Sequence, residues 1–214
     1  MKNIAIFASG SGSNFQAIVD AVEFGKIHSA QISLLVCDQP QAKVIERAKK
    51  YHIPTFVFSA KDYASKQDYE TEIRDLLLDL QIDLIVLAGY MKLIGKTLLD
   101  RFEGKIINIH PTLLPLFPGK DGILQSYQSA EKQLGITVHY VDSGMDTGKI
   151  IAQKSFERIG NETLEEIETR IHQLEHELYP QVIAEWINFG SKINFIIVEQ
   201  NIKKPLAAAS RRKG

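Results

Sequence analysis

The residues best suited to chemistry lie in the segment Asn108-Ile109-His110-Pro111, which ends a short apolar run. An amide can donate a hydrogen bond to an oxyanion, and an imidazole can move a proton near neutral pH. Because side chains alternate along a strand, Asn108 and His110 would point to the same side. A lone histidine is more often structural, but an amide and an imidazole together at a strand end favour acyl chemistry.

A carboxylate that could assist this histidine is Asp146, which lies between Gly144 and Gly148. A tight loop would hold Asp146 in one place, and its charge would favour the protonated form of a nearby imidazole. The competing interpretation is that Asp142 and Asp146 only accept turn hydrogen bonds from the neighbouring backbone.

A metal site is the weaker interpretation of these side chains. His110, His139 and Asp146 could cluster, and His172 and His176 are four residues apart, as in a helical zinc pair. However, the sequence contains no Cys/His signature and no zincin glutamate pattern around them. We therefore expect no metal cofactor.

A glycine-rich segment, Ser9-Gly10-Ser11-Gly12-Ser13-Asn14, lies between the first apolar run and a helical pattern. Glycines let the backbone turn tightly, and free amides at a helix start favour a phosphate. Phe15 replaces the third glycine of a dinucleotide fingerprint, and the lysine of a nucleotide-triphosphate loop is absent. The segment therefore predicts a phosphate monoester site, with a plain strand-to-helix turn as the alternative.

Short apolar runs alternate with helical patterns through the first half of the chain. The runs are residues 4–8, 32–37, 55–58, 84–88 and 106–109, and the helical patterns are residues 15–25, 42–51 and 69–81. This alternation predicts an α/β fold: a Rossmann-like, doubly wound, mostly parallel sheet with helices on both faces. The carboxyl ends of its strands would carry the site.

The second half of the chain lacks this regular alternation of apolar runs and helical patterns, which predicts a mixed C-terminal extension of the sheet. Prolines after His110 predict an irregular loop, followed by strands at residues 136–141 and 150–156. A long helix should run from about Thr163 to residue 189, with a Thr163–Glu166 capping box and Gly190 as its stop. We expect one domain over residues 1–190. Residues 191–214 would form an extension with an edge strand at 193–198 and a flexible basic tail.

Composition narrows the class of protein. The 214 residues are 44% hydrophobic, enough for one domain with a sizeable core. A net charge of −1 gives no indication of nucleic acid or a membrane surface as partner. The single cysteine, Cys37, lies in an apolar run and is expected to be a buried thiol. Since neither a signal peptide nor a membrane-spanning run is visible, we expect a cytoplasmic location.

Taken together and in this order, these segments resemble the folate-dependent formyltransferases, in particular the family of phosphoribosylglycinamide formyltransferases, over residues 1–189. The matching segments are a phosphate loop at 7–14, a folate segment at 87–94, a catalytic strand and loop at 107–119, and an aspartate loop at 138–151. Ser11, Lys92 and Lys149 stand where the family more often has asparagine, arginine and proline, which are mild departures.

The resemblance implies a reaction and a role for each matching residue. The reaction would move a formyl group from the co-substrate 10-formyltetrahydrofolate to the amine of glycinamide ribonucleotide (GAR), in de novo purine (IMP) biosynthesis. The catalytic set would be Asn108, His110 and Asp146. The substrate would be held by Gly12, Ser13, Asn14 and Glu175, and the folate by Lys66, Met91, Lys92, Leu93, Ile94 and Asn108. The partners of the protein would be small molecules, and the chain would be a monomer or a homodimer.

Four alternatives are weighed against this interpretation. A formyltetrahydrofolate hydrolase would carry an N-terminal regulatory domain, whereas the first strand here begins at Ile4. A methionyl-tRNA formyltransferase would carry a C-terminal nucleic-acid-binding domain and a basic surface. A dehydrogenase needs an acidic residue after its second strand, and Asp38 meets this poorly beside Pro40. A non-catalytic binding module would not need the three catalytic residues.

Overall fold

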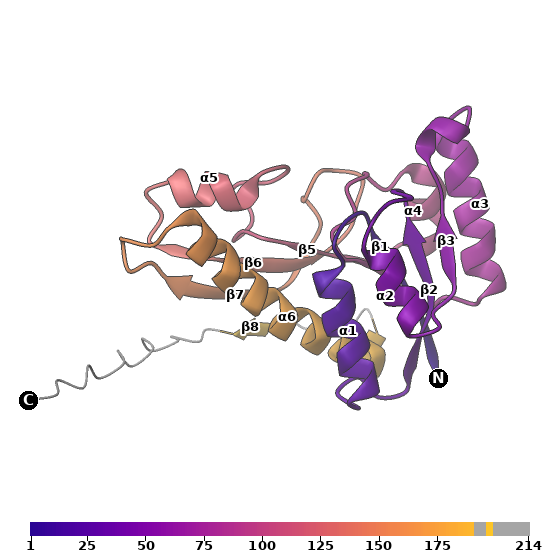
Figure 1. Cartoon of the computed structure of the whole chain (residues 1–214), viewed down its shortest axis with the longest axis horizontal. Coiled ribbons are helices and arrows are strands. Elements are labelled where there is room, and N and C mark those ends of the chain that lie inside the picture. Colours follow the sequence, from indigo (N-terminus) through magenta and orange to yellow (C-terminus); the bar gives the residue numbers. More distant parts are fainter. Residues whose placement is uncertain (191–195, 199–214) are drawn as a thin grey trace, which may run out of the picture.

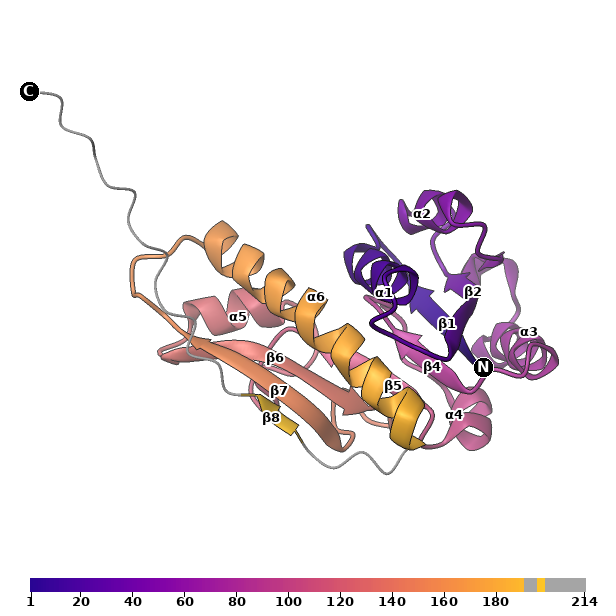
Figure 2. The ribbon, with the colours of Figure 1, turned by 90° about the horizontal axis from the view of Figure 1, so that it is seen from below.

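The computed structural model describes residues 1–190 and 196–198, and these residues form an eight-stranded sheet with helices on both faces (Figures 1 and 2). The strands are β1 (Lys2–Ala8), β2 (Ala30–Cys37), β3 (Thr55–Val57), β4 (Leu84–Leu87), β5 (Ile106–His110), β6 (Gln133–Tyr140), β7 (Ile150–Glu157) and β8 (Ile196–Val198). Their order across the sheet is β3-β2-β1-β4-β5-β6-β7-β8.

The sheet is mostly parallel, as the sequence predicts. The first five strands are parallel and lie in the order β3-β2-β1-β4-β5, while β6 is antiparallel to both β5 and β7. This confirms the doubly wound α/β fold with a mixed C-terminal part. Strand β8 lies at the sheet edge, parallel to β7, within the predicted range 193–198. The rest of that range and the basic tail lie outside the described residues, so the division at residue 190 stays a prediction.

The helices cover two separate apolar cores. One face carries α1 (Ser13–Glu23), α2 (Val44–Lys50), α5 (Gly122–Gln128) and α6 (Leu164–Phe189), and the other carries α3 (Lys66–Asp79) and α4 (Lys96–Phe102). Strand β1 supplies both cores, because Ile4 and Ile6 face one and Ala5 and Phe7 face the other. A parallel strand buried on both faces reads as a continuous apolar run, which is how β1 appears in the sequence.

Helix α6 has the ends that the sequence predicts. The Thr163 side chain accepts from the Glu166 amide, the Glu166 carboxylate accepts from the Thr163 amide, and Gly190 is the C-cap. Tyr179 is fully buried, and its hydroxyl lies 2.9 Å from the Leu87 carbonyl oxygen and 3.1 Å from that of Ile107. Tyr179 therefore ties α6 to the end of β4 and to the start of β5, the strand that carries the candidate site.

The sequence did not predict α4, α5 or a single 3₁₀ turn at Ala60–Asp62. The irregular loop that the prolines after His110 predict is present over residues 111–121, and the unpredicted helix α5 follows it before β6. Both missed helices have seven residues and no side-chain cap, so neither their period nor their ends stand out. Short helices of this kind depend on tertiary packing, which α4 obtains by burying Leu98 and Phe102.

None of the helices among the described residues combines the length and apolarity that crossing a membrane requires.

Candidate active site

The three residues expected to be catalytic lie together at the carboxyl end of β5. Asn108 and His110 project from the same side of the strand, and Asp146 reaches them from the loop between β6 and β7. The Asn108 amide nitrogen lies 3.4 Å from Asp146 Oδ1, and His110 Nδ1 lies 3.4 Å from Asp146 Oδ2. The backbone of Asp146 has φ 55°, a conformation that aspartate adopts more readily than most residues.

The hydrogen bonds of His110 indicate which of its nitrogens carry protons. Nε2 lies 2.8 Å from the carbonyl oxygen of Phe117, which can only accept, so Nε2 carries a hydrogen. Nδ1 faces the Asp146 carboxylate, and a second hydrogen there would let it donate as well. The buried imidazole thus lies between two acceptors, a carbonyl oxygen and a carboxylate.

His139 joins this cluster, although the sequence placed it outside the catalytic set. Its Nδ1 lies 2.8 Å from the Tyr140 carbonyl oxygen, so Nδ1 donates. Its Nε2 lies 3.2 Å from the Asn108 amide nitrogen and 3.5 Å from Asp146 Oδ1. Nε2 can therefore accept from the Asn108 amide when it carries no hydrogen, or donate to Asp146 Oδ1 when it carries one.

Asp146 is held as a carboxylate by its neighbours. Burial alone would raise the pKa of Asp146, but hydrogen bonds from His139 and from the Gly119 amide, together with the charges of both histidines, lower it overall. The Gly119 amide nitrogen lies 2.8 Å from Oδ2. Asp142, by contrast, accepts from Gly144 and Thr147 and from no other residue in the described part of the chain. The turn interpretation is thus right for Asp142, whereas Asp146 reaches across to other elements.

The predicted phosphate loop leads into α1 in the expected way. Gly12 is the N-cap of α1 with φ 75°, and no side chain caps the helix. A Cβ on Gly12 would lie 2.6 Å from Val44 Cγ2, so glycine is needed for space as well as for conformation. The first amides of α1, beginning with Ser13, are therefore left without a capping side chain, as an anion site requires.

The structure brings two distant substrate-site candidates into contact. Asn14 Nδ2 donates to Glu175 Oε2 across 3.0 Å, and both side chains are buried. Asn14 Oδ1 is buried and has no hydrogen-bond partner among the described residues. Glu175 also lies 2.9 Å from His172 Nδ1, and this contact raises the pKa of His172 against the effect of burial.

The second histidine of that helix, His176, stacks on His172 with ring centroids 6.4 Å apart. His172 is engaged by Glu175 rather than aimed at a shared point with His176. Over residues 1–190 and 196–198, no group of three or more His, Cys, Asp or Glu side chains is arranged to hold a metal ion.

The segment expected to line the folate site follows β4. Met91 and Leu93 are 74% and 54% exposed, which is unusual for large apolar side chains, whereas Ile94 is buried. Lys92 Nζ lies 3.7 Å from the buried Asp38 carboxylate. The segment thus offers apolar surface and a cation at the carboxyl edge of the sheet.

The start of this segment is held by two residues that the sequence analysis did not assign to it. Ser9 Oγ accepts from the Met91 amide across 2.9 Å and donates to Asp38. Asp38 had been considered only as a possible ribose ligand of a dehydrogenase. Because Asp38 is buried and engaged by Ser9 and Lys92, it is not available for that role.

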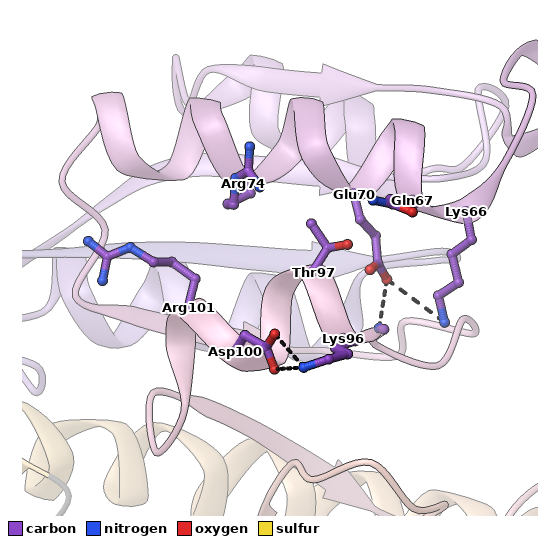
Figure 3. A pocket seen from close by; sticks show the side chains of 9 residues that line it. Lys66, Gln67, Glu70, Arg74, Lys96, Thr97, Asp100 and Arg101 are labelled. Carbon is purple, nitrogen blue, oxygen red and sulfur yellow. Dashed lines mark hydrogen bonds and ion pairs between the residues drawn. The ribbon is translucent and has the colours of Figure 1, made fainter.

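The end of the segment is held by helix α3, as Figure 3 shows. Glu70 Oε1 accepts from the Gly95 amide across 2.7 Å, and Lys66 Nζ donates to the Leu93 carbonyl oxygen across 2.6 Å. Burial raises the pKa of Glu70 against the effects of Gly95 and Lys66. The sequence did contain a signal for Glu70, since it shares a helical face with the buried Ile73.

Comparison with known proteins agrees with this geometry. The family model described as formyl transferase matches residues 2–183. The chain is 54% identical over 192 residues to phosphoribosylglycinamide formyltransferase of Bacillus subtilis (strain 168), covering 90% of this chain and 98% of the relative. It is 38% identical to the Haemophilus influenzae enzyme of the same name, covering 89% of each. The crystal structure of glycinamide ribonucleotide transformylase 1 from Geobacillus kaustophilus, 59% identical, has a TM-score of 0.84 over 86% of this chain and 98% of that one. The chain belongs to the formyl transferase family.

Proposed function

We propose that this protein transfers the formyl group of 10-formyltetrahydrofolate to the amine of GAR, giving formyl-GAR and tetrahydrofolate in de novo purine (IMP) biosynthesis. The observation that carries the proposal is the convergence of Asn108, His110 and Asp146 at the end of β5. Relatives and structural neighbours that carry the name of this activity support the choice of substrates.

In the proposed reaction, the GAR amine attacks the formyl carbon and a tetrahedral oxyanion forms. Asn108 and the protonated His110 would stabilise that oxygen by hydrogen bonding. The attacking nitrogen then loses a proton, the bond from the formyl carbon to the folate nitrogen breaks, and that nitrogen takes up a proton. Much of the rate would come from holding the two substrates together. The scheme uses no metal.

The role of Asp146 follows from its distances to the two donors. Its charge would stabilise the imidazolium of His110, and its second oxygen would orient the Asn108 amide. His110 Nε2 is engaged by the Phe117 carbonyl oxygen. A substrate oxygen could use this donor only after that carbonyl moves away, so we expect substrate binding to displace Phe117.

The GAR phosphate is proposed to bind the amides of Gly12, Ser13 and Asn14. An uncapped helix start supports this assignment, because its amides and dipole favour a dianion. Glu175 would contact the glycinamide part. Its hydrogen bond to Asn14 supports that role, since it places Glu175 directly beside the phosphate loop.

The folate is proposed to lie along Met91, Lys92, Leu93 and Ile94, with Lys66 and Asn108 also in contact. Exposed Met91 and Leu93 would pack on its rings, and the lysines suit its glutamate carboxylates. Small-molecule partners, a monomer or homodimer, and a cytoplasmic location remain parts of the same proposal.

The test is to incubate the purified protein with GAR and 10-formyltetrahydrofolate and to measure formyl-GAR by mass spectrometry and tetrahydrofolate by absorbance. We expect the two products in equal amounts, and their loss in His110→Ala. A parallel reaction without GAR separates formyl transfer from hydrolysis. Formate release that does not depend on GAR would replace this proposal with a hydrolase.

A further inference from the structure

A groove of about 630 Å³ lies between α3 and α4, the two helices that cover one face of the sheet (Figure 3). No role has been assigned to most of its side chains. The charged residues that line it are four cations and two carboxylates: Lys66, Arg74, Lys96, Arg101, Glu70 and Asp100.

The groove has more positive than negative charge available to a ligand. Glu70 is buried, accepts from the Gly95 amide and lies 3.8 Å from Lys66 Nζ, so it faces the protein and offsets part of the charge of Lys66. The Lys96–Asp100 pair has side chains 86% and 60% exposed, and such pairs contribute little energy and exchange easily. Arg101 makes no ion pair within residues 1–190, and Arg74 is paired only with the exposed Asp75.

The groove begins where the proposed folate site ends. Lys66 lines the groove and also donates to the Leu93 carbonyl oxygen of the folate segment. From Lys66, the groove follows α3 for about two turns to Arg74, roughly 12 Å at the helical rise. Figure 3 shows Lys66 at one end, with Arg74 and Arg101 toward the other.

We propose that this groove binds the γ-linked glutamate chain of an extended folate co-substrate. The inference rests on the proposed function, in which a folate lies along residues 91–94 with its glutamate near Lys66. Each further γ-linked glutamate adds a free carboxylate, and the forked guanidinium groups of Arg74 and Arg101 suit carboxylates. Because these side chains are on the surface, the gain in affinity is modest and is screened by salt.

The experiment compares tetrahydrofolate carrying one glutamate with tetrahydrofolate carrying three, by isothermal titration calorimetry. The wild-type protein should bind the triglutamate about three- to tenfold more tightly, the effect of one or two exposed ion pairs. In the double variant Arg74→Ala/Arg101→Ala, the ratio should fall to about one, while the affinity for the monoglutamate stays unchanged.

Two controls separate a specific groove from general charge. Lys49→Ala/Lys50→Ala removes the same charge from α2, on the opposite face of the sheet, and should keep the preference for the triglutamate. Raising the salt from about 0.05 M to about 0.5 M should weaken that preference in the wild-type protein.

Equal affinities in the wild-type protein, or a preference that survives in Arg74→Ala/Arg101→Ala, would overturn the inference. Formyl transfer from the monoglutamyl co-substrate does not depend on Arg74 or Arg101. If transfer is normal and no preference is found, the groove inference alone fails. If neither folate binds, both the groove inference and the proposed co-substrate fail.

Discussion

Replacing Asp146 by asparagine removes the carboxylate charge from the candidate site with little change of shape. Asparagine has nearly the same shape and tolerates a backbone φ of 55°. Its amide oxygen can still accept from the Gly119 amide, as Asp146 does. Two things are lost: the negative charge 3.4 Å from His110 Nδ1, and the acceptor for the Asn108 amide, because an NH2 group takes the place of Oδ1 when the oxygen stays at Gly119. Asp146→Asn therefore tests whether the carboxylate supports the reaction.

The distance between the two residues sets the size of the effect. A full charge pair at 3.4 Å, with an effective dielectric constant of about 20, interacts by about 5 kcal/mol. Only part of this interaction energy lowers the activation barrier. The same attraction is present before the reaction begins, and burial of Asp146 disfavours its charged form. If about half is realised in the transition state, turnover falls by about a hundredfold, at about 1.4 kcal/mol per factor of ten.

The assay measures kcat and both KM values for GAR formylation near neutral pH. Circular dichroism and thermal unfolding establish that each variant is folded. Asp142→Asn is the matched control, because Asp142 lies in the same loop but accepts from Gly144 and Thr147 within that loop. Its kcat should stay within about threefold of wild type. A folded Asp146→Asn protein with an equally small change in kcat would refute the proposed role of the charge.

Four further outcomes are expected. His110→Ala should lower kcat by about a hundredfold or more while the circular dichroism spectrum stays unchanged; near-normal turnover would remove His110 from the mechanism. Gly12→Ala should raise the KM for GAR and lower the unfolding free energy by about 1–3 kcal/mol in denaturant titrations, because its Cβ would meet Val44 at a strained φ; unchanged values would contradict the loop assignment. Because the folded-state pKa of Asp146 is lowered, its stabilisation is present above the unfolded value of about 3.9 and is lost as pH falls through the folded value. The unfolding free energies of wild type and Asp146→Asn should therefore converge on acidification; a constant difference would count against the coupling. Thr163→Ala should cost about 1 kcal/mol in thermal unfolding through loss of the α6 cap, with kinetics unchanged.

The fold class could be predicted because its signals are local. Each parallel strand is buried on both faces and appears as an apolar run, as β1 does. The ends of α6 were predicted from Thr163, Glu166 and Gly190, whose hydrogen bonds lie within one helical turn. Helices α4 and α5 were missed because packing on the sheet stabilises them, and their own sequences carry no cap.

The catalytic candidates could be selected because their residue types and order are distinctive. Asn108 and His110 share one strand, so their common orientation follows from alternation. Strand β6 ends beside Ile107, near the start of β5, and the loop that follows turns back so that Asp146 reaches Asn108 and His110. Alternation along one strand cannot supply this arrangement. The residues alone offered Asp146 as a candidate partner for a histidine, and the family resemblance placed it in the catalytic set.

The sequence by itself determined the α/β layering, the glycine turn into α1 and the residue types available for formyl transfer, because each depends on neighbours along the chain. Only the tertiary structure decided that Asn14 contacts Glu175, that Ser9 and Asp38 hold one end of the folate segment, and that Glu70 holds the other. These contacts join residues 25 to 161 positions apart. A carboxylate on a strand end or a helix face looks solvated in the sequence, and packing of the sheet against its helices buries it beside a particular partner.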